Sequence, residues 1–402
     1  MRPLRVGLFT DVFLPDHNGV STSVLLLARE LRRQGHDAWI ITPAVPGYVD
    51  TEDCIVRLRS FTNPALPRQR MAVPGKRRLL GRFDLIHTHT PWVAGWWGAR
   101  LASRWEAPHV ATFHTHLEAY THYVPGLSRL DRRVRAVQRL ARRFYETAEV
   151  LVAPSSESAR VVQGYGVTRP VRVVPTGIDP RLLEAAPPLS GPWPAGTRRL
   201  LSVGRLGHEK RFEVVLEALR QLRTQHNAHL AIIGEGPQAS ELRALAARLG
   251  VADAVTFVGP VPLAHMGAYY RQAELFLFGS DTETQGLVLH EAQVMGVPVV
   301  AVGAQGTLDG VRNGESGFLV APGDASGLAR HAHELLSSST LHTAFSAGAR
   351  SFARASTVEG VTARMLDVYA EAFWRASARP WTDRSPDVTA RRSTLLFGRR
   401  GS

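Results

Sequence analysis

The feature that most constrains the fold is a rhythm of short β-branched runs, each followed by a stretch with helical spacing, which occurs twice along the chain. Such alternation is typical of parallel sheets covered by helices. The strand-like runs of the first series lie at residues 5–10, 38–42, 84–89, 110–114, 150–154 and 171–175. Those of the second series lie at residues 200–203, 230–233, 255–258, 275–278, 297–302 and 318–320. The sequence therefore predicts an α/β protein with two doubly wound domains.

Between the two series the rhythm breaks at residues 184–196, which are too rich in Pro and Gly for a regular element. A polar, basic end without periodicity indicates a disordered tail. The predicted parts are a first domain at 1–180, a linker at 181–196, a second domain at 197–360, a last amphipathic helix at 361–378 and the tail at 379–402. Two such domains form a cleft between the carboxyl edges of their sheets, where ligands bind in folds of this class.

The composition of the chain limits the kinds of partner that it is expected to bind. The net charge of +13 favours anions such as nucleotides, phospholipid head groups or nucleic acid. No recognition motif for nucleic acid is present. Lys76 and Lys210 are the only lysines, so a lysine at position 210 suggests that a compact ammonium is needed there. The chain has no apolar run near the ~18 residues that cross a bilayer, no signal peptide and a single cysteine, Cys54. These features predict a cytoplasmic protein.

The first loop that could carry chemistry is 204–210, which follows the predicted strand at 200–203. Arg205 can hold phosphate oxygens in a bidentate manner, and Lys210 adds a point charge. On a leaving diphosphate, both would stabilise the charge that develops. The alternative is a pair of solvated cations on an exposed turn.

The second loop, at 280–287, follows a buried strand and opens a helix. The helix N-terminus is expected to offer backbone amides from Thr284, Gln285, Gly286 and Leu287. Glu283 immediately precedes these amides, and Glu291 follows eight residues later, which corresponds to ~12 Å along a helix axis. That spacing suits two hydroxyl-bearing parts of one long ligand. The alternative makes Glu283 a capping carboxylate and Glu291 an exposed helix residue.

At this point the sequence resembles a family. Glu-x7-Glu with the intervening Gly-Leu, and Gly-Arg-Leu-x-x-Glu-Lys, are similar to segments of the retaining glycosyltransferases of family 4. The resemblance covers nearly the whole chain. It implies the GT-B fold, in which two Rossmann-like domains face each other across a cleft. It also implies that Arg205 and Lys210 hold the donor diphosphate, that Glu283 binds hydroxyls of the transferred sugar, and that Glu291 holds the ribose.

The resemblance further implies a hexosyltransferase with a UDP or GDP sugar as donor, retention of anomeric configuration, no cofactor and no bound metal. The leaving phosphate would take the acceptor proton. In the first domain, Gly19 would let the backbone approach the donor, although Asn18 stands where members commonly have a first glycine. His114 would contact the donor sugar. The histidine pairs 87/89 and 114/116 have metal-ligand spacing, but cleft or core histidines are the favoured interpretation.

The acceptor is less constrained. Residues 129–145 form a basic amphipathic pattern that suits an anionic membrane surface, or an ordinary helix with solvated arginines. Segments 10–15, 18–20, 113–115, 122–126 and 282–287 resemble diacylglycerol glucosyltransferases and phosphatidylinositol mannosyltransferases, with departures at 117–119. That resemblance implies a lipid acceptor and a peripheral position on the inner membrane face. The alternatives are a soluble or cell-wall acceptor and a sugar-nucleotide epimerase, against which Glu283 and Glu291 argue together.

Overall fold

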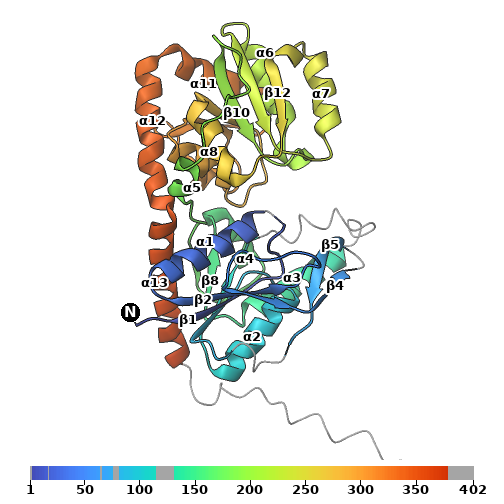
Figure 1. Ribbon diagram of the computed structural model, residues 1–402, viewed down its shortest axis with the longest axis vertical. Coiled ribbons are helices and arrows are strands. Elements are labelled where there is room, and N and C mark those ends of the chain that lie inside the picture. The colour runs from blue at the N-terminus through green and yellow to red at the C-terminus, as the bar shows by residue number, and fades with distance from the viewer. Residues whose placement is uncertain (1, 17, 64–65, 76–80, 115–130, 379–402) are drawn as a thin grey trace, which may run out of the picture.

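The computed structural model describes residues 2–16, 18–63, 66–75, 81–114 and 131–378, and it contains two parallel sheets, each covered by helices (Figure 1). The first sheet has the order β3-β2-β1-β6-β7-β8-β9. Its strands are β1 (Arg5–Phe9), β2 (Asp37–Pro43), β3 (Ile55–Leu58), β6 (Leu85–Thr88), β7 (His109–Thr112), β8 (Val150–Ala153) and β9 (Val171–Val173). The covering helices are α1 (Gly19–Arg33), α2 (Val93–Trp105), α3 (Asp131–Tyr145) and α4 (Ser156–Gly164).

The second sheet has the order β12-β11-β10-β13-β14-β15. Its strands are β10 (Arg198–Val203), β11 (Ala228–Ile233), β12 (Val255–Gly259), β13 (Leu275–Phe278), β14 (Val299–Val302) and β15 (Gly317–Val320). Its larger helices are α6 (Phe212–Leu222), α7 (Ala239–Arg248), α8 (Leu263–Gln272), α9 (Leu287–Val294), α11 (Ala325–Ser337) and α12 (Ser339–Ala353). In each sheet the first strand of the half is central, with the chain winding outward on both sides, which is the doubly wound topology predicted above.

Every strand predicted from the sequence is present, with bounds that differ by one or two residues at most. Three elements were not predicted: the short edge strand β3, and the antiparallel hairpin of β4 (Ser60–Asn63) and β5 (Leu66–Ala72). A short helix, α5 (Pro180–Glu184), occupies the start of the stretch predicted as a linker.

Helix α1 begins at Gly19 because Asn18 caps it. The Asn18 side chain accepts from the amides of Val20 and Ser21, while Ser21 Oγ accepts from the Asn18 amide at 2.9 Å. Such reciprocal capping satisfies amides that have no acceptor within the helix. Gly19, which was expected to let the backbone approach the donor, is therefore the first residue of a helix whose amino end points toward the other half of the molecule.

The last helix, α13 (Val358–Ser377), belongs to the core of the first half, although it follows the second half in sequence. It begins earlier than the predicted 361–378. Met365, Val368 and Tyr369 pack in one cluster with Val6 and Leu8 of β1. Figure 1 shows α12 and α13 running along one side of both halves.

The two chain segments that pass between the halves are bonded to each other. The Ile178 amide donates to the Ser356 carbonyl at 2.9 Å, and the Val358 amide donates to the Ile178 carbonyl at 2.8 Å. A Cβ added at Gly177 would lie 2.6 Å from the Cα of Val358, so a side chain there would push the segments apart. The connection is a two-stranded joint beside the start of α13.

Candidate active site

The loop after β10 is held backbone to backbone against the loop after β11. The Leu206 amide donates to the Glu235 carbonyl at 2.9 Å, and a Cβ added at Gly234 would lie 2.0 Å from the Gly204 carbonyl oxygen. Gly234 has a φ of +135°, which glycine adopts without strain. This packing fixes the loop that carries Arg205, which is exposed, and Lys210, which ends the short helix η3 (His208–Lys210).

The loop after β13 is tied to the same place. Ser280 Oγ donates to the Glu209 carbonyl at 3.0 Å, and the Lys210 ammonium forms an ion pair with the Glu283 carboxylate. The Lys210 side chain is 23% exposed and the Glu283 side chain 12% exposed. The structure thus brings together two residues that the sequence separates by more than seventy positions. Glu283 pairs with Lys210 and is not a helix cap, so the alternative considered for it is wrong.

Helix α9 opens directly after this loop. Gly286, with a φ of +76°, is its N-cap, so the amides of Leu287 and Val288 begin the helix and have no acceptor within it. A Cβ added at Gly19 would lie 3.8 Å from Leu287 Cδ1. The amino ends of α1 and α9 therefore face each other across the two halves, and both favour anions.

Two further contacts hold the start of α9, and the sequence did not reveal either. The Gln285 side chain accepts from the Thr176 amide at 2.7 Å and donates to the Thr176 carbonyl at 3.0 Å. Both ends of this amide are therefore engaged with the joint between the halves. Gly306 donates to the Glu283 carbonyl at 2.8 Å, and a Cβ at Gly306 would lie 2.2 Å from the Thr284 carbonyl oxygen.

Glu291 lies in the second turn of α9 and is partly buried. Tyr270 Oη donates to its Oε2 at 2.7 Å. Burial raises the pKa of Glu291, and the hydrogen bond from Tyr270 opposes that rise. The separation of ~12 Å estimated from helical rise does not apply, because α9 begins at Leu287 and Glu283 precedes it. Glu291 is also not the exposed helix residue of the alternative interpretation.

The first half contributes a group of histidines at the ends of β6 and β7. His89 Nδ1 and His114 Nε2 are 2.9 Å apart, and the rings of His87 and His89 have centroids 4.1 Å apart and are tilted by 33°. Burial lowers the pKa of His114 to about 4, and it lowers the pKa of His87 and His89 well below the ordinary value. All three imidazoles are therefore neutral at pH 7.

The pair His87 and His89 does not form the metal site that its spacing allowed. His87 Nδ1 pairs with Tyr369 Oη at 2.9 Å and its Nε2 with Thr112 Oγ1 at 2.7 Å, so both nitrogens are occupied by hydroxyl groups. His116, the second member of the pair 114/116, lies outside the described residues. Within the part of the chain that the structure describes, no group of three or more His, Cys, Asp or Glu side chains could hold a metal ion.

Two family models match the chain, one in each half. "Glycosyltransferase Family 4" matches residues 17–182, and "Glycosyl transferases group 1" matches residues 190–352. The alpha-monoglucosyldiacylglycerol synthase of Streptococcus pneumoniae is 32% identical over 320 residues, which cover 75% of this chain and 71% of that protein. The chain is a family 4 glycosyltransferase.

A second relative of this glycosyltransferase is similar over most of its length. The D-inositol 3-phosphate glycosyltransferase of Acidothermus cellulolyticus is 30% identical, over 90% of this chain and 89% of that protein. Among solved structures, sucrose-phosphate synthase from Thermosynechococcus elongatus has a TM-score of 0.72 at 22% identity, covering 92% of this chain and 99% of that one. Anabaena HepE, solved with UDP and glucose, has a TM-score of 0.70 at 19% identity, covering 91% and 99%. These similarities confirm the predicted GT-B fold.

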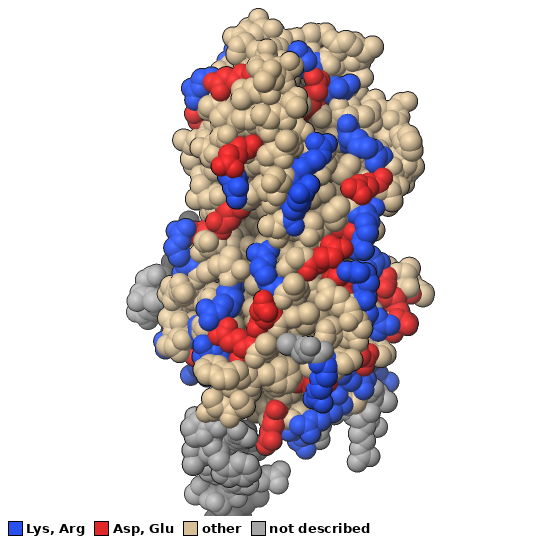
Figure 2. Space-filling model, turned by 90° about the vertical axis from the view of Figure 1, so that its left-hand side faces the viewer, with Lys and Arg blue, Asp and Glu red and all other residues tan. Residues whose placement is uncertain are grey.

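The basic helix predicted at 129–145 is α3 in this glycosyltransferase, with Arg129 and Leu130 outside the described residues. In its last turns Ala141 and Phe144 are buried, while Arg139, Arg142 and Arg143 are exposed. Leu140 is 48% exposed. Over the described ranges, the structure has no helix both long and apolar enough to cross a membrane. On the face drawn in Figure 2, basic side chains are interspersed with acidic ones over both halves.

Proposed function

We propose that this family 4 glycosyltransferase moves a hexose from a nucleoside diphosphate sugar to a hydroxyl group of a membrane lipid, with retention of configuration and without a bound metal. The observation that carries the proposal is the arrangement around Lys210. This ammonium, the Glu283 carboxylate and the amino end of α9 meet at one sheet edge, opposite the amino end of α1.

The donor diphosphate is assigned to Arg205, Lys210 and the first amides of α9. Guanidinium and ammonium groups both bind phosphate oxygens, and free amides at a helix start add donors that need no reorganisation. Charge grows on the diphosphate as the glycosidic bond breaks. Cations that are already in place lower the free energy of the transition state more than that of the bound donor, and this difference accelerates the reaction.

The two glutamates are assigned to the hydroxyl groups at the two ends of the donor. Glu283, beside Lys210, accepts from hydroxyls of the transferred sugar, and Glu291 accepts from the ribose. Among the described residues, Tyr270 is bonded to Oε2 of Glu291, and Oε1 is assigned to a ribose hydroxyl. Because Tyr270 itself is buried and anchored in the core, its hydrogen bond also fixes the orientation of the carboxylate.

The reaction consistent with these roles needs no side-chain nucleophile. The acceptor oxygen bonds to the anomeric carbon on the face from which the phosphate oxygen departs. The acceptor proton passes to that phosphate oxygen, so the products are the glycoside and the protonated nucleoside diphosphate. Arg205 and Lys210 offset the negative charge, which is the task a divalent cation performs in other sugar transferases.

A lipid acceptor is supported by relatives and by surface chemistry. The names of the relatives from Streptococcus pneumoniae and Acholeplasma laidlawii refer to diacylglycerol. The exposed Arg139, Arg142 and Arg143 beside Leu140 would favour an anionic membrane, and this supports a peripheral position at the inner face as part of the proposal. A soluble inositol phosphate is the second candidate acceptor, favoured by the relative of 30% identity that covers 90% of this chain.

The deciding experiment is a matrix of donors and acceptors. Purified enzyme is incubated with UDP and GDP forms of glucose, galactose and mannose, each with diacylglycerol in anionic vesicles, with inositol phosphate or with water alone. Product mass and anomeric configuration are then measured. Transfer to diacylglycerol with an α-linkage from an α-donor supports the proposal, whereas inversion, or transfer only to inositol phosphate, contradicts it.

A further inference from the structure

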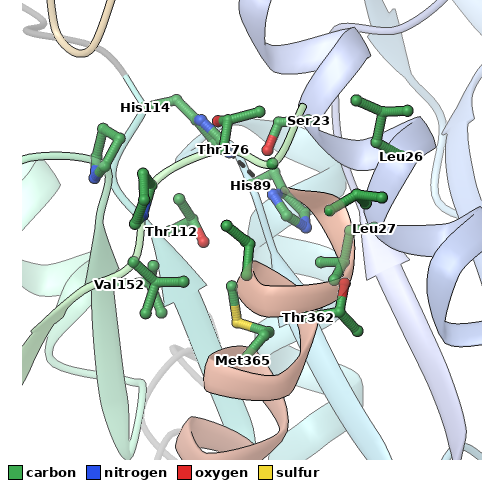
Figure 3. A pocket seen from close by; sticks show the side chains of 16 residues that line it. Ser23, Leu26, Leu27, His89, Thr112, His114, Val152, Thr176, Thr362 and Met365 are labelled. Atoms are coloured by element: carbon green, nitrogen blue, oxygen red, sulfur yellow. Dashed lines mark hydrogen bonds between the residues drawn. The ribbon is translucent and has the colours of Figure 1, made fainter. Parts of the chain in front are cut away.

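His89 is a buried imidazole to which none of the roles above has been given. It follows β6 and is 2% exposed. Figure 3 shows its ring between Leu27 of α1 and the residues of α13, with a hydrogen bond to His114. The surrounding pocket is mostly apolar, with Leu26, Val361 and Met365 among its lining residues.

The contact between the two rings links their tautomers. His89 Nδ1 and His114 Nε2 are 2.9 Å apart, so one nitrogen carries the proton and the other accepts it. If His114 donated from Nε2, a neutral His89 would carry its proton on Nε2. That nitrogen is buried and has no hydrogen-bond partner among the described residues. A buried N–H without an acceptor costs free energy, and orphaned donors of this kind are rarer in proteins than under-satisfied acceptors.

The opposite arrangement leaves no orphaned donor on His89 and moves the unpartnered N–H to the less buried His114. His89 donates from Nδ1 to His114 Nε2, and its own Nε2 remains a bare acceptor in the apolar pocket. His114 then carries its proton on Nδ1. This nitrogen has no partner among the described residues, and His114 is less buried than His89. Protonating both nitrogens of His89 would put a charge in the apolar pocket, and burial lowers the pKa of His89 well below the ordinary value.

We propose that His89 is a positioning residue for His114: its Nδ1–H fixes His114 as the neutral tautomer protonated on Nδ1, so that His114 meets the donor sugar as a hydrogen-bond donor. The inference rests on the proposed function for the contact between His114 and the sugar. Glu283 can only accept hydrogen bonds, so a sugar between the two residues would receive a donor from one side and an acceptor from the other. That polarity selects the orientation of the sugar hydroxyls.

The tautomer can be measured without any reaction. Protein labelled with ¹⁵N-histidine gives long-range proton–nitrogen spectra that distinguish a protonated ring nitrogen from a bare one, and the spectrum of H114A assigns the signals of His114. We expect a protonated Nδ1 and a bare Nε2 in the wild type and in H89N, since the asparagine amide nitrogen can occupy the place of Nδ1. In H89L we expect the two tautomers to mix.

Activity provides the second measurement. H89L should lower kcat about 10- to 100-fold with a smaller change in donor KM, since a misdirected group near the reacting atoms has effects of this order. H89N should restore the rate to within about threefold of the wild type, and the H89L/H114A double variant should lose no more than H114A alone. M365A is the matched control, because Met365 lines the same pocket but does not contact His114 through a hydrogen bond. It should lower thermal stability and leave the His114 tautomer unchanged.

The outcomes separate the two proposals. A His114 protonated on Nε2 in the wild type, an unchanged tautomer in H89L, or losses that multiply in the double variant would overturn the positioning role. A wild-type rate for H114A would refute the proposed contact between His114 and the sugar, and the tautomer spectra alone would then decide the role of His89.

Discussion

The replacement of Lys210 by alanine tests the central assignment. Two unit charges about 4 Å apart interact by about 4 kcal/mol at an effective dielectric constant near 20. The Lys210 side chain is 23% exposed and is already paired with Glu283, so only part of that energy is gained when the diphosphate becomes more negative. We take about half, about 2 kcal/mol, which corresponds to a loss of about 30-fold in kcat for K210A, somewhat less than the removal of one preorganised donor costs elsewhere.

The ion pair makes a second variant informative. In K210A the Glu283 carboxylate has lost its counter-charge and repels the diphosphate, so donor KM should rise. K210A/E283Q removes that repulsion and should recover part of the donor affinity without recovering kcat. Thermal unfolding should change little in K210A, because a partly exposed ion pair contributes about 0–1 kcal/mol.

The matched control is R223A. Arg223 also forms an ion pair, with Asp253 at 2.8 Å, but it follows the carboxyl end of α6, at the edge of the sheet away from the donor loops. Like K210A, the R223A substitution removes one positive charge from the second half, but its activity should stay within about twofold of the wild type. Steady-state rates with donor and acceptor both saturating provide the measurement. Near-wild-type turnover of K210A under these conditions would refute the phosphate assignment.

Three other predictions concern metal, membrane and pH. Transfer should persist in EDTA, since no metal-binding group is found among the described residues; loss of activity that manganese restores would reverse this expectation. The triple variant R139E/R142E/R143E should bind anionic vesicles more weakly than the wild type, by about 1 kcal/mol for each arginine near the surface. Its hydrolysis of the donor should continue. Equal binding of variant and wild type in a flotation assay would make α3 an ordinary solvated helix. Burial lowers the pKa of His114, and of His290 in α9, to about 4 in the folded protein. In the unfolded chain each histidine has its ordinary pKa near 6.5, so below that pH the unfolded chain binds more protons than the folded protein. The free energy of unfolding should therefore be retained above pH 6.5 and fall by about 1–2 kcal/mol per histidine between pH 7 and pH 5. Urea unfolding that is flat over this range would contradict neutral burial of these rings.

The sequence predicted what depends on local pattern. β-branched runs placed the strands, and since parallel strands end at a common edge, the loops of Lys210 and Glu283 could be expected to meet. The helical spacing drawn from Glu283 to Glu291 was wrong because Gly286 adopts a left-handed conformation and starts the helix there. Helical spacing in a sequence indicates that a helix exists, but the residue at which the helix begins depends on capping.

Contacts between distant loops could not be predicted in the same way. The Gln285 side chain forms hydrogen bonds with the backbone of Thr176. Because nearly every residue has the same backbone amide and carbonyl, the sequence does not indicate which of them a side chain will contact. The spacing within the pairs 87/89 and 114/116 allowed metal ligands, although cleft or core histidines were the favoured interpretation, and the structure stacks His89 on His114 as neutral rings. Whether an imidazole binds a metal or another imidazole depends on what surrounds it, and here apolar residues of α1 and α13 surround His89.

The position of α13 also determines the order in which the chain can mature during synthesis. The first sheet needs Val361, Met365, Val368 and Tyr369 to complete its core, and these residues leave the ribosome after both halves have been made. Domains generally fold as units, with amino-terminal ones first. In this enzyme the amino-terminal half must instead wait with an uncovered apolar face, while the second half, whose clusters lie almost wholly between Ile178 and Phe345, can finish first. The half that is translated first is therefore the one whose core is completed last, and its apolar face stays uncovered longest during synthesis.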